Sequence, residues 1–278
     1  MTTKPPTPDP DTSRTADTTG LISTRAHSFN AAAAQYAENR PSYPPALFDT
    51  LEELAGRSLT GARVVDVGAG TGIASARLRE RGARVIAVEP GAGMAAEFRR
   101  GLPDVPIVRG NGNALPLAGA TADFITYAQA WHWTDPERSL PEALRVLRPG
   151  GALALWWNTD ALDVPWIGEQ ADRIQSHFGV DGVVAKNGDG ARSAMAHFID
   201  RLGFTRRTVR WSRRITLDMH LANIGSHSAF LVAPEGSRDA FLDAERAHLL
   251  NVFPDGIVEE TYDVMLLVAL NTRTDLDT

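Results

Sequence analysis

A glycine-rich turn between an apolar run and a predicted helix constrains this chain more than any other feature. Residues 64–67, apolar except for Asp66, form a short run typical of a buried parallel strand, and Gly68, Gly70 and Gly72 follow at alternate positions. Glycines at this spacing let the backbone turn tightly and approach a ligand before a helix begins at Ile73. The pattern predicts a parallel sheet with a binding cradle at the carboxyl end of its first strand.

The second apolar run narrows the kind of ligand. Residues 85–88 are predicted to form the next strand, which ends in Glu89, a carboxylate suited to accepting hydrogen bonds from a ribose diol. The third glycine of the dinucleotide fingerprint is missing, because the sixth position counted from Gly68 is Ile73. Asp66, two positions before the first glycine, suits a ligand with a cationic amino group better than a pyrophosphate. We therefore expect a nucleoside that carries an amino acid.

Several motifs in order resemble a known enzyme family. The run from Asp66 to Gly72, D-V-G-A-G-T-G, resembles motif I of the class I S-adenosylmethionine-dependent methyltransferases. Three later segments agree in order and spacing: Glu89-Pro90 with Met94, residues 110–117, and residues 147–151. The resemblance covers residues 29–158 well and the last hundred residues in outline. It implies an α/β, Rossmann-like, doubly wound sheet of seven strands with the last strand antiparallel, and S-adenosyl-L-methionine as the cofactor.

Four regions follow from the pattern. Residues 1–20 are predicted to be a disordered tail, 21–60 N-terminal lid helices, 61–160 the cofactor-binding core, and 161–278 cap helices plus the last two strands. The expected core strands are 64–67, 85–88, 107–109, 124–128 and 152–157. The resemblance implies that 208–216 and 258–270 are the sixth and seventh strands, the seventh lying between the fifth and the sixth. Helices are expected at 46–55, 164–178, 191–202 and 217–250.

Composition limits the partners. A net charge of −6 with scattered lysines and arginines argues against a nucleic-acid surface, and the absence of cysteine excludes thiolate catalysis and disulfides. The chain has no apolar stretch long enough to span a bilayer, and the first twenty residues lack the apolar segment of a signal sequence. The histidines show no metal-ligand spacing. We expect a cytoplasmic enzyme that binds neither metal, membrane nor nucleic acid.

The resemblance implies a role for residues in each cofactor motif. Glu89 would accept both ribose hydroxyls. Asp66 would orient the amino group of the methionine part, directly or through the loop, and it could also cap the glycine turn. Met94 would lie against adenine or in the core, and Asn111 stands where many relatives carry Asp, so its amide oxygen would replace that contact or the contact is lost. The predicted cofactor-binding set is Tyr36, Arg40, Asp66, Gly68, Ala69, Gly70, Glu89, Pro90, Met94, Asn111, Gly112, Asn113 and Gln129.

A segment before the core resembles the Y-x-x-x-R-P-x-Y signature of related enzymes. Tyr36, Arg40 and Tyr43 carry this pattern, which implies a lid over the cofactor with Arg40 meeting its carboxylate. The alternative is a structural turn held by the neighbouring prolines. Apolar residues at helical spacing over 21–36 predict a helix that packs on the main body or on a second copy of the chain as a homo-oligomer.

Aromatic residues gather after the fourth and fifth strands. His132 is the leading candidate for a catalytic residue, because it could act as a general base. Alternatively, it could pack on adenine or cap the helix that begins at Pro136. Gln129 would lie beside the transferred methyl group. An apolar acceptor is predicted, bound by Trp131, Trp133, Trp157, Trp166, His227 and Phe230.

The chemistry leaves the acceptor atom open. Methyl transfer from a sulfonium is an in-line displacement that depends mostly on positioning and exclusion of water. The chain is similar to C-methyltransferases of the teleocidin type, which implies natural-product biosynthesis with methylation of a terpenoid olefin and cyclisation through a carbocation. Such a cation needs an aromatic pocket poor in carboxylates. The alternatives are an O- or N-methyltransferase of a small acid or phenol, and a cofactor-binding cyclase or regulator that transfers no methyl group.

Overall fold

A computed structural model describes residues 39–179, 203–231 and 233–272. The predicted tail, the helices expected at 21–36 and 191–202, and Tyr36 lie outside the described residues. The helix expected at 46–55 is α3 (Pro45–Ala55), with Pro45 at its first position, where a missing backbone N–H costs no hydrogen bond.

A seven-stranded sheet in the order β3-β2-β1-β4-β5-β7-β6 forms the centre of the described chain. Neighbours from β3 to β5 are parallel, whereas β7 runs antiparallel to both β5 and β6. This confirms the predicted fold, including the place of the seventh strand. The strands are β1 (Arg63–Val67), β2 (Arg84–Glu89), β3 (Ile107–Arg109), β4 (Ala122–Ala128), β5 (Leu147–Asp160), β6 (Thr205–Thr216) and β7 (Ile257–Leu270).

Helices cover both faces of the sheet, and this explains the apolar runs. On one face α3, α4 (Ile73–Glu80) and α5 (Ala92–Gly101) pack on a cluster that includes Val64 and Phe124. On the other face α6 (Pro136–Val146) packs on a cluster that includes Val65 and Ile125. Because successive residues of one strand are buried on opposite faces, the central strands carry apolar residues on both faces.

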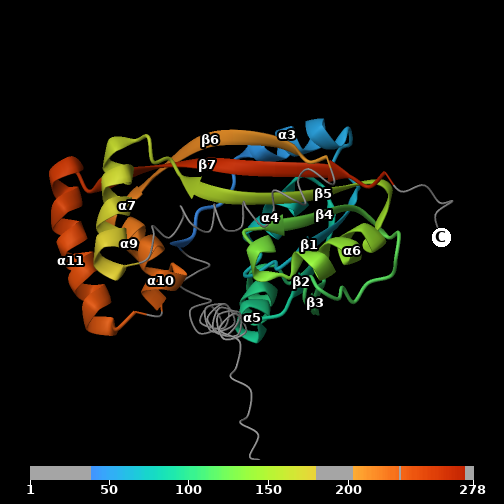
Figure 1. Cartoon of the computed structure of the whole chain (residues 1–278), viewed down its shortest axis with the longest axis horizontal. Helices are drawn as coiled ribbons and strands as arrows, with labels where there is room; N and C mark the ends of the chain where they lie inside the picture. Colours follow the sequence, from blue (N-terminus) through green and yellow to red (C-terminus); the bar gives the residue numbers. More distant parts are fainter. Residues whose placement is uncertain (1–38, 180–202, 232, 273–278) are drawn as a thin grey trace, which may run out of the picture.

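A separate group of helices caps one end of the sheet (Figure 1). These are α7 (Pro165–Phe178), α9 (Leu217–Gly225), α10 (Ser228–Leu231) and α11 (Glu235–Val252). They enclose a hydrophobic cluster of their own. The helical stretch expected at 217–250 is broken into three pieces: α9 ends at Gly225, and Pro234, with a φ of −55° and a ψ of 136°, precedes α11.

The fifth strand is longer than expected and reaches this cap. Where the sequence predicted 152–157, β5 continues to Asp160 because it pairs with β7 as far as Asp160 opposite Tyr262. The carboxyl end of β5 therefore lies beside the cap, at the edge of the sheet where doubly wound folds bind ligands (Figure 1). Among the described helices, none combines the length and apolarity that a bilayer span requires.

Candidate active site

The three glycines of the turn after β1 adopt backbone conformations that other residues rarely reach. Their φ angles are 67° at Gly68, 57° at Gly70 and 96° at Gly72. A Cβ atom on Gly68 would lie 2.5 Å from the Cβ atom of Ala130, so this glycine allows close packing. A Cβ atom on Gly70 would meet no atom within 4 Å, so space beside this glycine is open for a ligand.

Glu89 at the end of β2 is held by the same turn. Its buried carboxylate accepts hydrogen bonds from the backbone N–H groups of Gly70 (2.8 Å, to Oε2) and Gly91 (2.6 Å, to Oε1). Burial raises the pKa of Glu89, against the effect of these bonds and of the Arg109 charge. Each carboxylate oxygen has a second lone pair, so an oriented acceptor remains for a diol.

The side chain of Asp66, on β1, is buried. The fully buried carboxylate accepts hydrogen bonds from the Ser75 hydroxyl (2.6 Å) and the Thr126 hydroxyl (2.9 Å). Burial raises its pKa to about 6 despite these bonds. Because both oxygens are occupied by hydroxyl donors, from α4 and from β4, the contacts favour the expected role through the loop over direct contact with the cofactor.

The residues expected near adenine form a compact turn. Met94 is buried on α5. The Asn111 side-chain oxygen accepts from the backbone N–H of Asn113 (3.0 Å), and that of Asn113 accepts from the N–H of Asp135 (2.9 Å). Gly112 has no room for a Cβ atom, which would lie 3.0 Å from the Tyr127 hydroxyl oxygen. The side chains of Asn111 and Asn113 therefore shape the turn, and contact between this turn and adenine stays a prediction. Pro90 is exposed and Ala69 is buried, and their contacts with the cofactor also stay predictions.

The residues expected near the methionine part lie at the cap side of the site. Gln129 has a φ of 57° at the end of β4, and its side chain donates to the carbonyl oxygen of Asn158 on β5 (3.3 Å). Arg40 donates to the carbonyl oxygen of Ser226 at the end of α9 (3.2 Å). Tyr43 is buried against Trp156, with 5.7 Å between ring centroids. Tyr43 thus anchors the proline-rich turn, residues 40–45, on the core, and Arg40 reaches from this turn to the cap.

His132 is placed poorly for a base. Its Nδ1 atom lies 3.2 Å from Trp157 Nε1, which can only donate, so Nδ1 is the acceptor and the proton of the neutral ring is on Nε2. The ring packs on Trp133 at 4.6 Å between centroids, and burial lowers the pKa of His132 to about 4. These contacts favour the packing interpretation. The expectation that His132 could cap α6 is wrong, because the Asp135 side chain accepts from the first turn of that helix.

Two residues predicted to bind substrate are packed in hydrophobic clusters, and their contact with substrate stays a prediction. Trp131 is 3% exposed and contacts Tyr127 edge to face at 4.8 Å. Phe230 is fully buried in the cap, 4.6 Å from the Phe178 ring. Both side chains have a packing role, because each belongs to an apolar cluster whose members are far apart in the sequence.

A cavity of about 40 Å³ lies between the cap and the ends of β5 and β7. It brings together two of the predicted substrate residues, Trp166 and His227. Sequence reasoning missed these other polar residues of the cavity: Asp160, Gln170, His220, Asn223, Glu260, Thr261 and Tyr262. One signal was present in the sequence: Glu260 and Tyr262 alternate with exposed positions in a strand whose other inward residues, Val258 and Val264, are apolar.

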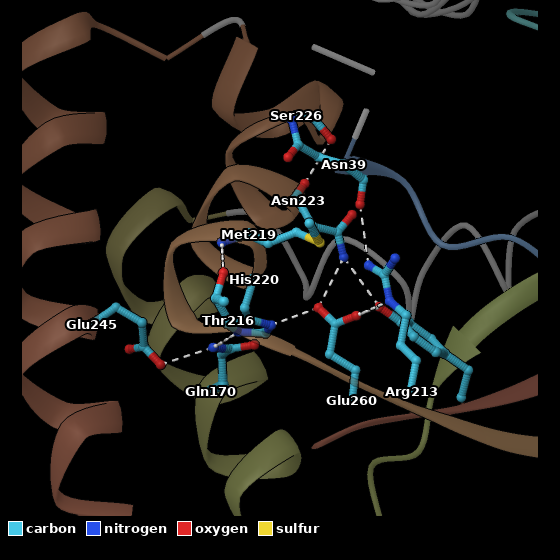
Figure 2. Close-up of polar contacts among 11 residues, drawn as sticks. Asn39, Gln170, Arg213, Thr216, Met219, His220, Asn223, Ser226, Glu245 and Glu260 are labelled. Atoms are coloured by element: carbon cyan, nitrogen blue, oxygen red, sulfur yellow. Dashed lines mark hydrogen bonds and ion pairs between the residues drawn. The ribbon is translucent and has the colours of Figure 1, made fainter. Parts of the chain in front are cut away.

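Glu260 is the centre of a buried polar network beside this cavity (Figure 2). Its carboxylate accepts from His220 Nδ1 (2.7 Å), Arg213 Nε (2.6 Å), the Tyr262 hydroxyl (2.7 Å) and Asn223 Nδ2 (3.2 Å). Burial alone would raise the pKa of Glu260, but the bonds from His220 and Tyr262 and the nearby charges lower it below its ordinary value.

The network fixes the tautomer of His220. Gln170 Nε2 lies 2.9 Å from His220 Nε2 and also donates to Glu245 (2.9 Å), so the amide nitrogen is the donor to both (Figure 2). His220 Nε2 is then the acceptor, and its Nδ1 proton faces Glu260. The network links α7, α9 and α11 to β7, so it holds the cap on the sheet.

Two acceptors are left without donors among the described residues: the Asp160 carboxylate at the cavity and the buried Oδ1 atom of Asn223. Within the described part of the chain the Asp160 carboxylate makes no hydrogen bond or ion pair, and burial and the Glu260 charge raise its pKa to about 6 against the charges of His220 and Arg40. The buried Oδ1 atom of Asn223 also has no donor among these residues, although its Nδ2 atom donates to Glu260 and to Tyr262 (3.1 Å). The cavity is therefore equipped to receive O–H or N–H groups. The described His, Asp and Glu side chains form no group suited to holding a metal ion.

Comparisons with known proteins identify the family of this chain. Residues 65–155 match a family described as methyltransferase domain. An uncharacterised methyltransferase of Mycobacterium tuberculosis is 36% identical over 219 residues, which cover 79% of this chain and 84% of that protein. A methyltransferase-like protein of Schizosaccharomyces pombe is 28% identical over 76% of this chain and 81% of its own length. A solved structure assigned as a type II methyltransferase, from Anaeromyxobacter dehalogenans, has 24% identity and a TM-score of 0.58 over 84% of this chain and 99% of that chain.

The chain belongs to the class I S-adenosylmethionine-dependent methyltransferases, and it is an enzyme of that class. S-adenosylmethionine is its cofactor. The described residues fit this molecule: the turn is open at Gly70, and Glu89 is an oriented acceptor beside it. The Thr71 hydroxyl, buried in the same turn, has no hydrogen-bond partner in the described structure.

Proposed function

We propose that the protein methylates a small molecule whose polar end enters the cavity between the cap and the sheet. The position of this cavity carries the proposal. Gln129, predicted to lie beside the transferred methyl group, contacts Asn158, and Asp160 follows two residues later on the same strand. Two strand residues span about 7 Å, so the cavity is next to the predicted place of reaction.

We assign the cofactor residues as the motifs suggest. Glu89 accepts the ribose hydroxyls, Met94 and Asn111 contact adenine, and the backbone at Gly68 to Gly70 runs beside the methionine part. Arg40 binds the methionine carboxylate. Its hydrogen bond to Ser226 at the cap supports the proposal that the segment around Arg40 borders both cofactor and substrate. Bound cofactor supplies an electrophilic methyl group. The chain positions the acceptor and excludes water from it.

The lining of the cavity bears on the acceptor. Leu162, Trp166, Ile167, Ile174 and Ile224 supply apolar contacts, which support an acceptor with an apolar body. Asp160 and Glu260 are two carboxylates where the sequence analysis expected a pocket poor in them. Glu260 is already bound by four donors, but the Asp160 carboxylate is not. Asp160 supports transfer to a hydroxyl or amine, whose proton must be removed, so O- or N-methylation is our leading proposal.

The second proposal is C-methylation of a terpenoid olefin, with cyclisation, in natural-product biosynthesis. Trp166 supports it, since its indole face at the cavity could stabilise a cation. A carboxylate beside such a cation would also favour early loss of a proton, which argues for a simple methylated olefin over a cyclised product.

An acceptor panel distinguishes these proposals. The protein is incubated with isotope-labelled S-adenosylmethionine and with phenols, small carboxylic acids, amines and prenylated indoles, and products are analysed by mass spectrometry. A gain of one methyl group on oxygen or nitrogen supports the leading proposal, and a gain on carbon supports the second. Cofactor binding without methylation of any panel member contradicts the proposed small-molecule substrate.

A further inference from the structure

We propose that the acceptor is an amine with an apolar body, and that its ammonium group binds the Asp160 carboxylate before the nitrogen is methylated. This inference rests on the proposed function, because it chooses between hydroxyl and amine acceptors for the same site. It starts from an imbalance of charge. Among the described residues that line the cavity, Asp160 is the one charged side chain without a hydrogen-bond or ion-pair partner.

The other ionisable groups at the cavity leave no charge to balance. The Glu260 carboxylate is paired with Arg213 at 2.6 Å and accepts further hydrogen bonds from its neighbours. His220 is neutral, because Gln170 donates to its Nε2 atom and its only ring proton is on Nδ1. Burial lowers the pKa of His227 well below its ordinary value, so this ring is also neutral at pH 7. Neither histidine therefore brings a positive charge to Asp160.

Arg40 does not neutralise Asp160. Its guanidinium donates to the carbonyl oxygen of Ser226 at 3.2 Å, and no ion pair joins it to the Asp160 carboxylate. In the proposed function this guanidinium binds the methionine carboxylate of the cofactor, so its charge is balanced there and is not counted a second time. The described groups therefore leave one excess negative charge at the cavity, on Asp160.

An unpaired carboxylate selects a ligand that donates hydrogen bonds and carries positive charge. A hydroxyl group supplies a hydrogen bond alone, whereas an ammonium group supplies charge-assisted hydrogen bonds and also balances the charge of Asp160. The Trp166 ring at the same cavity would add a favourable contact with a cation. A carboxylic acid, ionised at neutral pH, would place a second unbalanced anion there, so this reasoning excludes the small-acid alternative.

The size and position of the cavity fit the head group of an amine. A volume of about 40 Å³ holds a few water-sized groups, such as an ammonium with its first carbon atoms, but not a whole ring system. Leu162 lines the cavity and is 47% exposed, so the apolar body can extend past this side chain. Asp160 follows Asn158, which Gln129 contacts, so the nitrogen would lie next to the predicted place of methyl transfer.

The transfer step balances with one proton released to water. The ammonium group gives a proton to the Asp160 carboxylate, which releases it to water, and a neutral amine remains. The nitrogen lone pair then forms the N–CH₃ bond while the S–CH₃ bond breaks and its electron pair returns to sulfur. The product is a methylammonium ion, which the ionised Asp160 carboxylate balances until the product leaves.

Binding of an ammonium group depends on the ionisation of Asp160. The titratable and charged groups around this carboxylate are Glu260 and Tyr262 from β7, His220 from α9, His227 after α9, and Arg40 before α3. Burial and the Glu260 charge raise the pKa of Asp160 to about 6. The affinity for an amine should therefore be complete at neutral pH and fall as the pH is lowered through about 6, because protonation removes the charge that the ammonium balances.

Three probes with the same apolar body test the class of head group. We would measure binding of 2-phenylethylamine, 2-phenylethanol and 3-phenylpropanoic acid by calorimetry in the presence of S-adenosylhomocysteine, whose sulfur carries no charge. At neutral pH the amine should bind about tenfold more tightly than the alcohol, and the acid more weakly than both. With labelled S-adenosylmethionine the amine should gain one methyl group on nitrogen. Binding of the alcohol or the acid as tight as that of the amine would overturn the inference.

Asp160→Asn removes the charge and leaves the shape of the side chain. Its affinity for 2-phenylethylamine should fall about tenfold, to that for 2-phenylethanol, and lose the change near pH 6, while affinity for S-adenosylhomocysteine is unchanged. The matched control is Asp163→Asn, three residues away, where the exposed carboxylate pairs with Arg210 and the preference for the amine should persist. A preference for the amine that persists in Asp160→Asn would refute the role of Asp160.

The methylation results separate this inference from the proposed function. If phenols of the wider acceptor panel gain a methyl group and no amine does, the enzyme methylates small molecules as proposed, but the inferred amine is wrong. If wild type binds cofactor but methylates no probe and no member of that panel, the proposed function itself fails.

Discussion

Glu89→Gln is the most direct test of the cofactor site. In the structure the two carboxylate oxygens each accept a backbone N–H, from Gly70 and from Gly91, and each has a lone pair left for a ribose hydroxyl. The amide of glutamine has one oxygen only. Its NH₂ group would face one of these N–H donors, so one buried donor loses its partner and the diol loses one charge-assisted hydrogen bond.

The size of the effect follows from these contacts. A hydrogen bond to a charged group is worth about 1.5 to 3 kcal/mol, which corresponds to a loss of affinity of roughly tenfold to 150-fold. Calorimetric titration with S-adenosylhomocysteine measures it. The matched control is Glu80→Gln, because Glu80 is an exposed residue of α4 that pairs with Arg77 and should not alter binding.

The pH dependence provides an independent check. The pKa of Glu89 is raised by burial, so the carboxylate takes up a proton at a higher pH than an ordinary glutamate. As the pH is lowered, the affinity of the wild type for S-adenosylhomocysteine should therefore begin to fall at a pH above the ordinary glutamate pKa. Glu89→Gln should lack this fall. Undiminished affinity of a folded Glu89→Gln protein, with the wild-type pH profile, would refute the ribose assignment.

Three other substitutions have expected outcomes. Gly70→Val should abolish binding of S-adenosylhomocysteine in calorimetry, because the side chain fills the open space at a φ of 57° that valine rarely adopts; measurable binding would contradict the cradle. His132→Ala should lower the methylation rate less than tenfold, since a histidine with a pKa of about 4 is neutral and packs, whereas a hundredfold loss would restore it as general base. Glu260→Gln should reduce the free energy of unfolding in urea by about 3 kcal/mol, because Arg213 is left without its buried partner. That contribution should be complete above the ordinary glutamate pKa and disappear as the pH falls through the lowered pKa of Glu260, and a loss that does not depend on pH would argue against the ion pair.

The order of elements in the core was readable from the sequence because each signal is local. Apolar runs buried on both faces predict parallel strands, and β1, β2 and β3 begin and end within one residue of the expected bounds. The glycine turn and Glu89 were found in the same way, since a positive φ and a strand-end carboxylate depend on a few neighbouring residues. Family resemblance supplied the place of β7, which local pattern does not determine.

The roles of aromatic residues were harder to predict. The predicted substrate-binding tryptophans indicated an aromatic pocket, yet Trp131 is buried in the core, and Trp157 binds His132. An aromatic side chain has the same local signature in a core and in a pocket. Only the packing of distant elements decides which one it fills.

The sequence by itself determined the cofactor-binding half of this protein, because strand, turn and helix follow one another within about thirty residues from Val64 to Glu89. The tertiary structure decided the substrate half. Asp160 lies at the cavity because β5 pairs with β7 beyond its expected end, and His220 meets Glu260 across forty residues of chain. Such contacts depend on strand register and on how the cap helices pack, and neither is encoded in any short stretch of residues.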